Sequence, residues 1–475
     1  MKKNLIFIAF IFLFQTGFSQ TNKKINPVPT KSQLAWQNME YYFFVHFGPN
    51  TFTGLEWGKG TENAEVFDPK ELNCDQWCRI AKAAGATGIM ITAKHHDGFC
   101  LWPSKYSKHT VRESGWKNGK GDVLKELSAS CKKYGLKFGV YLSPWDRNHP
   151  AYGTPAYNHV FANMLKEIFT NYGPIWELWW DGANGEGPNG KKQIYDFARF
   201  TRIVRKLSPN TIIFSDIGPD ARWCGNEHGF AGKTNWDLLD TAGFRRGIGA
   251  PPVDTLNQGN VWGKNWIPAE CDVSIRPGWF NHKNEDSLVK SPEKLFEIYL
   301  KSVGRGTNLI LNVPPDGRGL ITKYDSASVI GFKKLREESF RNDLSKNTRQ
   351  YFVSNHKKSI TTKLDNENEN SFETIAHPDL QSILVDYNQP TKVNCVVLQE
   401  NLVNGQHCAK FTIKLIGKNH EVIKEITGTT IGHKRILTFP EQEVSSLNFS
   451  VDEQKAPTKI SSLKTYLVDE DLIEK

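Results

Sequence analysis

The sequence predicts an α/β fold: a (β/α)₈-like barrel followed by an antiparallel β-sandwich. Between residues 27 and 344, short apolar runs alternate with longer helical patterns, which indicates a parallel sheet whose strands are joined by helices. After residue 347 the pattern changes to short runs of alternating polarity, separated by turn-forming residues, which is typical of a sandwich. A chain of 475 residues has room for both domains. We therefore expect a catalytic barrel over 27–344 and a sandwich over 347–475.

Each strand of the expected barrel is an apolar run that ends in polar or turn-forming residues. The strands are expected at residues 41–48, 87–97, 136–143, 175–183, 211–216, 266–275 and 308–313. The helices are expected at residues 75–84, 122–134, 158–171, 191–207 and 292–303. Gly85 and Gly135 directly follow two of these helices, where glycine readily ends a helix. The tract 218–265 is rich in loops, so a distorted barrel fits the sequence as well as a regular one.

The strands of the second domain are expected at residues 382–386, 393–398, 410–415 and 435–439. Each is a short run in which apolar and polar side chains alternate, as in a sheet with one buried face. We expect this domain to pack against the barrel, and its part in function stays open.

The N-terminus has the pattern of a secretory signal peptide over residues 1–19. Lys2 and Lys3 precede ten apolar residues, 5–14, and the small residues Gly17 and Ser19 follow. This apolar run is too short to cross a bilayer. The rest of the chain contains no apolar run long enough to do so. We therefore expect an exported protein, periplasmic or extracellular, with no membrane span in its mature chain.

Composition excludes some function classes. The formal charge of +9 is spread along the chain without a dense Lys/Arg block, so we expect no nucleic-acid partner. The eight cysteines show no dense disulfide framework, and Cys74 and Cys78 lack a second pair at metal-binding spacing. We expect mostly buried free thiols and no metal or organic cofactor. The oligomeric state is not indicated by the sequence.

The stretch 175–183 carries the first candidate for chemistry, Asp181. Because side chains alternate along a strand, Glu177, Trp179 and Asp181 should share one face, and Trp176, Leu178 and Trp180 the other. A carboxylate beside indole rings is costly to bury unless it is hydrogen-bonded or used. The simpler alternative is that Asp181 only caps the following turn.

Several other strands also end in chemically capable residues. In a barrel of this kind the active site lies at the C-terminal ends of the strands. The residues expected there are His46, Glu56, Trp57, His95, His96, Tyr141, Asp181, Asp216, Arg222, Trp223, Glu227, Arg276 and Trp279. Any one of them could be an ordinary structural residue, but together they form a polar and aromatic rim.

Two chemistries could use this rim. Metal-assisted hydrolysis would need His95 and His96 on one ion, which is awkward if both lie on a strand, because adjacent strand residues point to opposite faces. Glycoside hydrolysis needs two carboxylates, neutral hydrogen-bonding groups and an aromatic wall. The residues present favour glycoside hydrolysis.

Six segments carry a resemblance to a known family. They are Val45-His-Phe-Gly48, Ala93-Lys-His-His-Asp-Gly-Phe99, Val140-Tyr-Leu-Ser-Pro144, Trp179-Trp-Asp-Gly182, Arg222-Trp-Cys-Gly-Asn-Glu227 and Ile275-Arg-Pro-Gly-Trp-Phe280. In this order they resemble glycoside hydrolase family 29, the retaining α-L-fucosidases. The last two segments resemble the branch that prefers α-1,3/1,4-linked fucose on Lewis-type glycans.

The resemblance implies a role for each site residue and a fucosylated oligosaccharide or glycoconjugate as the partner. Asp181 would be the nucleophile that forms a covalent fucosyl-enzyme, and Glu227 the acid/base. A retaining mechanism would place their carboxyl oxygens about 5–5.5 Å apart. The residues that would hold the fucose are His46, Glu56, Trp57, His95, His96, Tyr141 and Arg222, with Trp279 against its apolar side.

Some alternatives stay open. Glu270 rivals Glu227 as the acid/base, and Glu56 is a more distant rival. The activity could instead be a broad exo-fucosidase activity that extends to aryl and α-1,2-linked fucosides. A non-catalytic fucose-binding protein and a metal-dependent hydrolase are the alternatives from other classes.

Overall fold

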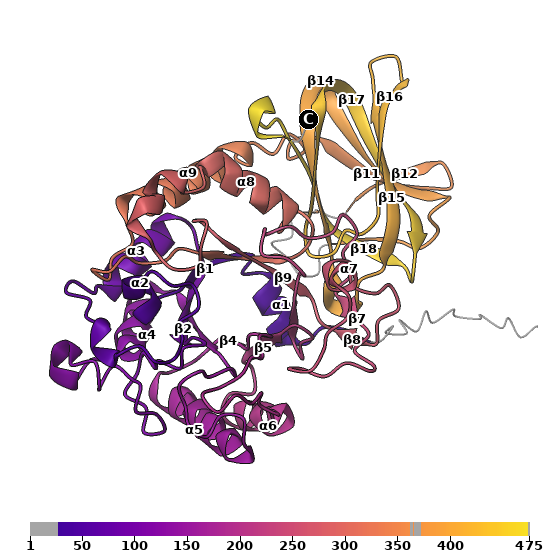
Figure 1. Ribbon diagram of the computed structural model, residues 1–475. Coiled ribbons are helices and arrows are strands. Elements are labelled where there is room, and N and C mark those ends of the chain that lie inside the picture. The colour runs from indigo at the N-terminus through magenta and orange to yellow at the C-terminus, as the bar shows by residue number, and fades with distance from the viewer. Residues whose placement is uncertain (1–26, 362–363, 365–371, 474–475) are drawn as a thin grey trace, which may run out of the picture.

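Eight parallel strands close into a barrel in a computed structural model that describes residues 27–361, 364 and 372–473 (Figure 1). Around the barrel the strand order is β1-β10-β9-β6-β5-β4-β3-β2. These strands are β1 (Tyr41–Val45), β2 (Gly88–Lys94), β3 (Lys137–Leu142), β4 (Glu177–Trp179), β5 (Ile212–Ser215), β6 (Ala221–Trp223), β9 (Ala269–Ser274) and β10 (Asn308–Asn312). The predicted barrel is confirmed, while the predicted signal peptide lies outside the described residues.

Helices surround the barrel. They are α1 (Lys31–Gln37), α2 (Pro49–Thr53), α3 (Cys74–Ala83), α4 (Val123–Tyr134), α5 (Pro155–Asn171), α6 (Phe197–Leu207), α7 (Val253–Gln258), α8 (Pro292–Lys301) and α9 (Lys323–Ser339). One of them, α1, lies across the N-terminal end of the barrel strands. The short 3₁₀ helices are η1 (Ala64–Val66), η2 (Trp116–Gly119), η3 (Lys283–Leu288), η4 (Leu402–Asn404) and η5 (Glu470–Leu472). Three pairs lie side by side: α3 with α4, α5 with α6, and α8 with α9 (Figure 1).

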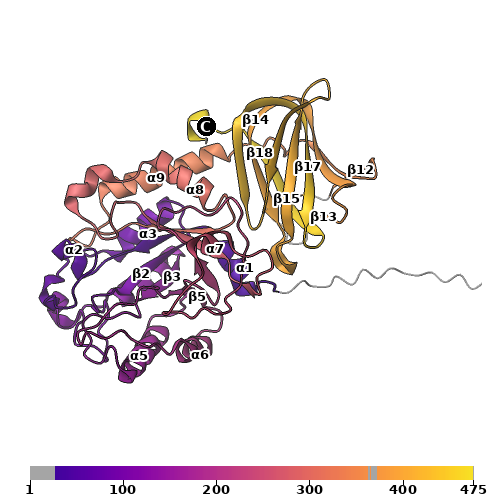
Figure 2. The same ribbon diagram turned by 45° about the vertical axis from the view of Figure 1, so that its right-hand side comes forward.

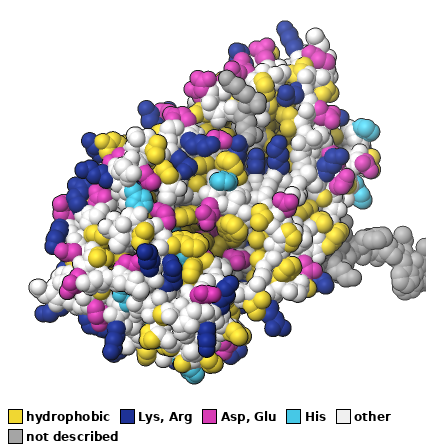
Figure 3. Space-filling view, viewed as in Figure 1, with side chains coloured by type: hydrophobic (Ala, Val, Ile, Leu, Met, Phe, Trp, Pro, Cys, Tyr) yellow, Lys and Arg dark blue, Asp and Glu magenta, His cyan; other side chains and the backbone are white. Residues whose placement is uncertain are grey.

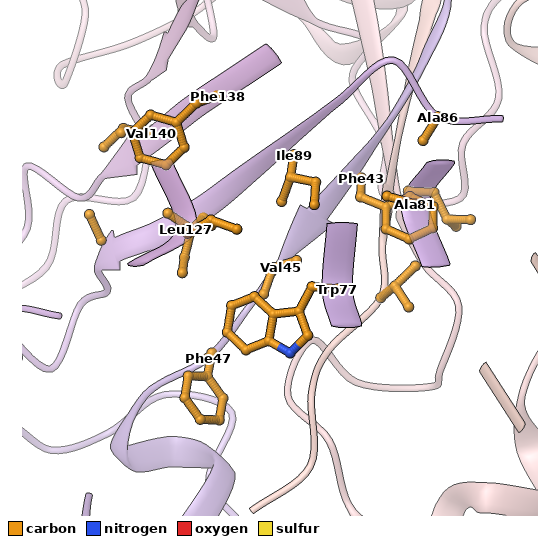
Figure 4. Close-up of a cluster of buried hydrophobic side chains, with 14 of the residues drawn as sticks. Phe43, Val45, Phe47, Trp77, Ala81, Ala86, Ile89, Leu127, Phe138 and Val140 are labelled. Atoms are coloured by element: carbon orange, nitrogen blue, oxygen red, sulfur yellow. The ribbon is translucent and has the colours of Figure 1, made fainter. Parts of the chain in front are cut away.

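The main core fills the space between the strands and this outer layer. Figure 4 shows Trp77 and Ala81 of α3 and Leu127 of α4 among the outward side chains of β1–β3, such as Phe43 and Ile89. All five are fully buried. Trp77 and Ala81 lie four positions apart, so they share one face of α3 and lock it onto the sheet.

The barrel is distorted where the sequence was hardest to assign. Residues 216–220 join β5 directly to β6 without a helix. The tract 218–265 also holds α7 and a small hairpin of β7 (Leu238–Leu239) and β8 (Asn265–Trp266). β6 spans three residues, too few for an apolar period to be recognised. Its absence from the predicted strands follows from that brevity.

The second domain is antiparallel, as predicted. Its strands are β11 (Arg349–Ser354), β12 (Lys357–Ile360), β13 (Glu373–Ile375), β14 (Gln381–Glu400), β15 (Cys408–Ile416), β16 (Val422–Gly428), β17 (Arg435–Gln454) and β18 (Thr458–Tyr466). The long strands β14 and β17 pair with each other through two register shifts, which bend the sheet around a core of its own. Figure 2 shows this domain beside the barrel, next to α8 and α9.

Charged and polar contacts join the two domains. Glu40, just before β1, accepts hydrogen bonds from His433 Nε2 at 3.1 Å and Lys434 Nζ at 2.7 Å. Burial alone would raise the pKa of Glu40, but the Lys434 ammonium and the hydrogen bond from His433 outweigh it and hold that pKa well below its usual range. The Gln406 amide oxygen accepts the backbone N–H of Asp237 at 2.8 Å. The second domain is thereby fixed to the N-terminal side of the barrel strands.

Two further expectations concern the described part of the chain. All eight cysteines are buried and free, which confirms that prediction. No helix among the described residues has the length and apolar character needed to cross a membrane.

Candidate active site

The C-terminal ends of β1 to β4 bring together five of the predicted site residues. His46 follows β1, His95 and His96 follow β2, Tyr141 lies near the end of β3, and Asp181 follows β4. Their rings lie close: His46 and His95 are 5.7 Å apart between centroids, His95 and His96 4.2 Å, and His95 and Tyr141 5.8 Å. Figure 3 shows hydrophobic side chains in a hollow on one face of the barrel, with acidic side chains along its edge.

An aromatic layer forms the floor beneath these groups. Trp179 stacks on Phe214 with 4.2 Å between ring centroids and 7° between planes. Tyr141 stacks on the other side of Trp179 at 5.4 Å, and Phe44 meets it edge-on at 5.5 Å. The inward face predicted for Glu177, Trp179 and Asp181 is therefore observed.

The residues predicted for the opposite face of this strand, Trp176, Leu178 and Trp180, lie there only in part. Leu178 and Trp180 point outward into the main core, as expected. Trp176 does not, which corrects that prediction: it packs edge-on against Tyr42, 5.2 Å away, because β4 begins only at Glu177.

Asp181 is held by two hydrogen bonds and remains partly open. Its Oδ1 accepts the backbone N–H of Ala183 at 2.7 Å, and its Oδ2 accepts the hydroxyl of Tyr141 at 3.1 Å. His96 Nε2 lies 3.8 Å from Oδ2, and the Asp181 side chain is 25% exposed. Asp181 therefore does cap the following turn, but it also presents a positioned carboxylate to the pocket.

Asn312 of β10 sets the orientation of His46. The Asn312 Nδ2 group donates to Ser274 Oγ at 2.9 Å and to the Trp279 carbonyl at 2.7 Å. Its Oδ1 must then be the acceptor that faces His46 Nδ1 at 2.9 Å, so Nδ1 carries the proton. His46 Nε2 is left with a lone pair. Asn312 was not among the predicted site residues, and its only signal in the sequence is an amide at the end of an apolar run.

His96 is oriented in the same way by Ser143. The Ser143 hydroxyl donates to the Trp145 carbonyl at 2.9 Å, so His96 Nδ1, 2.8 Å away, donates to Ser143 Oγ. Both imidazoles after β2 enter one pocket because the strand ends at Lys94. The strand-alternation argument against a shared direction for His95 and His96 therefore does not apply.

The three imidazoles are neutral near neutral pH. Burial lowers the pKa of His46 to about 3 and that of His96 to about 4, although Asp181 opposes the effect on His96. Burial and the neighbouring imidazoles also place the pKa of His95 well below its usual value. A neutral imidazole can donate one hydrogen bond and accept another, which suits hydroxyl groups better than a charged ligand.

The loop after β9 forms the opposite wall. Glu56 accepts the backbone N–H groups of Trp279 at 2.7 Å and Phe280 at 3.4 Å, and it lies 2.9 Å from His282 Nε2. A Cβ atom on residue 278 would lie 2.3 Å from Glu56 Oε1, so this close approach requires Gly278. Glu56 thus holds the loop that carries Trp279, and Trp279 packs against His46 at 4.9 Å between centroids.

Glu227 and Trp57 complete the rim. Glu227 Oε2 accepts Trp279 Nε1–H at 3.3 Å. Partial burial raises the pKa of Glu227, and the negative charge of Asp181 adds to that rise. Trp57 is 55% exposed and meets the rings of His96 and Trp145 edge-on at 5.4 and 5.6 Å. Both residues are available to a ligand that enters from solvent.

Arg222, predicted to bind substrate, points away from the pocket, which corrects that prediction. On β6 the inward residue is Trp223, whose Nε1 donates to Asp272 Oδ1 at 2.8 Å, so Arg222 faces outward. It is fully buried. Its guanidinium donates to Asn235 Oδ1 and to the backbone oxygens of Trp236, Leu256 and Ile267. Arg276 is likewise buried and is ion-paired with Asp286 and Asp325.

Glu270 lies below the aromatic floor. It is the second residue of β9, and it accepts hydrogen bonds from Tyr42 at 2.8 Å and Trp179 Nε1 at 3.2 Å. Burial, together with the neighbouring carboxyl of Glu177, raises its pKa well above the usual range. The Trp179 ring lies between Glu270 and Asp181, so the two carboxyls do not share a pocket.

A second cavity, of about 1120 Å³, opens at the other end of the barrel beside α1. The described residues that line it include several lysines and aromatic side chains but neither a carboxylate nor a histidine. The lining of this cavity therefore cannot supply two-carboxylate chemistry.

Comparisons with known proteins agree with this geometry. Residues 26–332 match the family model described as alpha-L-fucosidase. The chain is 39% identical over 458 residues to Alpha-L-fucosidase 1 of Arabidopsis thaliana, covering 93% of this chain and 88% of that protein. It is similar to the crystal structure of a glycoside hydrolase 29 family member from an unknown rumen bacterium, with a TM-score of 0.82, 40% identity, and 94% and 78% of the two chains covered. It is also similar to a Ruminococcus gnavus GH29 fucosidase in complex with fucose, with a TM-score of 0.83, 29% identity, and 94% and 96% covered.

The neutral histidines give a pH-dependent prediction. Because the pKa values of His46, His95 and His96 are lowered, we expect their ring resonances to keep neutral-imidazole shifts from pH 8 down to pH 5. NMR of selectively labelled histidine, assigned through the signals lost in the three His→Gln variants, measures this. A signal of this group that titrates near pH 6.5 would contradict the burial and tautomers described above.

Proposed function

The chain belongs to the α-L-fucosidase family, glycoside hydrolase family 29, and we propose that it is a retaining exo-α-L-fucosidase that releases α-1,3/1,4-linked fucose from Lewis-type glycans. It is a glycoside hydrolase. The observation that carries the mechanistic proposal is one pocket that holds a fixed carboxylate, Asp181, and a second carboxyl of raised pKa, Glu227.

Asp181 is the proposed nucleophile. The two hydrogen bonds to its oxygens hold the carboxylate in one orientation, which lowers the cost of bringing it to the anomeric carbon. As the Asp181 oxygen bonds to that carbon, the bond to the leaving oxygen breaks, and a covalent fucosyl-enzyme forms. Water then displaces Asp181, and two inversions retain the configuration.

Glu227 is the proposed acid/base. A raised pKa keeps a larger fraction of Glu227 protonated, as the first step requires, and after donating its proton Glu227 can activate water for the second step. Trp279 Nε1–H can stabilise the carboxylate that this donation leaves. Glu270 is a poorer candidate because the aromatic floor lies between it and Asp181.

The fucose hydroxyls are proposed to bind the imidazoles of His46, His95 and His96. The lone pair of His46 Nε2 accepts a hydroxyl proton, and the neutral rings avoid the desolvation of charge that a cationic site would require. Trp279, next to His46, offers a flat apolar face for the side of the ring that bears the methyl group. Glu56 and Trp57 supply the outer edge of this subsite.

Preference for α-1,3/1,4 linkages is proposed from two segments, residues 222–227 and 275–280. They carry Glu227 and Trp279 side by side, so the acid/base and the apolar wall share one rim of the pocket. A leaving group on this rim meets both, which gives the enzyme a means to distinguish branched glycans from simple fucosides.

Export to the periplasm or the exterior is proposed from residues 1–19. A charged start, an apolar run of ten residues and small residues at 17 and 19 support it. We expect the exported protein to lack these residues, and mass spectrometry of its N-terminus checks this. An intact Met1 on protein from the culture fluid or periplasm would contradict it.

The activity and its linkage preference are tested together. We expect the wild type to release fucose from Lewis a and Lewis x trisaccharides much faster than from 2′-fucosyllactose or an aryl fucoside, measured by chromatography. We expect Asp181→Ala to lower the rate by roughly 10⁴-fold or more, because the nucleophile is lost. NMR of the first sugar released shows the α-anomer if configuration is retained.

A different result would contradict each part of this proposal: the linkage preference, the retention of configuration and the catalytic activity. Equal release from all four substrates would refute the linkage preference and leave the activity. Initial release of the β-anomer would refute retention. An absence of release from every fucoside, with fucose still bound, would favour a binding protein.

Two glutamate-to-glutamine variants test whether Glu227 or Glu270 is the acid/base. Glu227→Gln should lower kcat/KM for a Lewis trisaccharide by about 10²–10⁴-fold, and by less for an aryl fucoside whose leaving group needs little protonation. Glu270→Gln, which removes one carboxyl below the floor, should keep kcat/KM within a few-fold. The reverse ranking, in protein shown by circular dichroism to be folded, would assign the role to Glu270.

A further inference from the structure

One carboxylate on the rim has no part in the mechanism above: Asp216, directly after β5. β4 and β5 pair in parallel with Trp179 opposite Phe214, and these two rings stack inside the barrel. Two residues further along each strand stand Asp181 and Asp216. Both lie beyond the last residue of their strand, so their contacts, and not strand alternation, show where their side chains point.

The absence of a side chain at Gly182 gives the Asp216 carboxyl room beside the chain. A Cβ atom on residue 182 would lie 2.0 and 2.3 Å from the two carboxyl oxygens of Asp216, so the carboxyl lies directly against the backbone that follows Asp181. Only a glycine at position 182 permits this approach. The contact places a second carboxyl next to the nucleophile.

The Asp216 carboxyl lacks a side-chain partner among the residues that the structure describes; the only group that hydrogen-bonds to it is its own backbone N–H. It is half-buried. Burial and the negative charge of Asp181 raise its pKa to about 6. A partly desolvated carboxyl without a partner is unfavourable unless a ligand or water supplies one.

The order of the strands around the barrel indicates which part of a bound substrate would lie beside Asp216. The proposed ligands of the fucose hydroxyls, His46, His95 and His96, follow β1 and β2, on one side of Asp181, and Trp279, which packs against His46, follows β9. β5 lies on the other side, between β4, which is followed by Asp181, and β6, which is followed by Glu227. The scissile bond must lie between these two carboxyls, so the group that leaves it passes over the end of β5.

We propose that Asp216 binds a hydroxyl group of the leaving-group sugar and is a specificity-determining residue for glycans over simple fucosides. The proposal rests on the proposed function, because it takes Asp181 and Glu227 as the two carboxyls at the scissile bond. The ligand class is a pyranose with a free hydroxyl near the glycosidic oxygen. An aryl leaving group has no such hydroxyl and gains nothing from Asp216.

The first experiment compares two substrates in Asp216→Asn and Asp216→Ala. Hydrogen bonds to charged groups contribute enough that Asp216→Ala should lower kcat/KM for a Lewis trisaccharide about 10- to 100-fold. The value for an aryl fucoside should change less than threefold. Asp216→Asn, which keeps shape and one acceptor, should lie between wild type and Asp216→Ala on the trisaccharide. Glu186→Gln, which removes an exposed carboxylate from the loop after Asp181, is the charge-matched control and should leave both values unchanged.

Equal losses on both substrates would overturn the proposal, because they would mean that Asp216 acts through Asp181 or through the fold. Unchanged values on both would overturn it too. If the wild type releases no fucose from any substrate, the proposed function itself fails, and that result is distinct from either pattern.

A binding experiment remains informative if a variant turns over poorly. In an Asp181→Ala background, calorimetry with fucose and with the trisaccharide compares protein with and without Asp216→Ala. We expect the Kd for fucose to stay the same and the Kd for the trisaccharide to rise about tenfold. A parallel rise for fucose, or no rise for the trisaccharide, would place Asp216 outside the leaving-group subsite.

Discussion

The stacked rings of Trp179 and Phe214 divide the interior of the barrel into two layers with opposite requirements. Below them, Glu177 and Glu270 are fully buried and accept hydrogen bonds from tyrosine and tryptophan donors. Above them, Asp181 keeps a partly open carboxylate. Carboxyl groups thus form a sealed structural pair in the lower layer, whereas the carboxylate of the upper layer is a candidate for chemistry. Without the aromatic floor, water from the pocket would reach the lower pair and the two layers would merge.

The upper layer depends on polar groups that lie behind the imidazoles and orient them. Asn312 fixes the tautomer of His46, and Ser143 fixes that of His96. Burial then keeps both rings neutral. The pocket is therefore built to exchange hydrogen bonds with hydroxyl groups, while negative charge is concentrated on Asp181, Asp216 and Glu227. This separation of neutral binding groups from carboxyls is what a glycosidase with two carboxyls requires.

Sequence reasoning reached most of the barrel because its strands are long apolar runs bounded by turns, as at 41–48 and 308–313. It located Asp181 because a carboxylate between indole rings and a glycine is conspicuous. It missed β6, whose three residues carry no detectable period. It also missed Asn312, Ser143 and Asp272, since each is an ordinary polar residue whose importance depends on a partner from another strand.

By itself, the sequence determined the alternation of strands and helices, the order of the motifs and hence the family, because these depend on local pattern and residue identity. Only the tertiary structure decided which side chains face the pocket. Arg222 stands five positions before Glu227 in one motif, yet it points outward into backbone oxygens, because its neighbour Trp223 takes the inward position of β6. Glu270 and Glu227 differ little as residues, but closure of the barrel puts one below the aromatic floor and the other on the rim. The direction of a side chain depends on where its strand begins and ends, and packing of distant segments sets those limits.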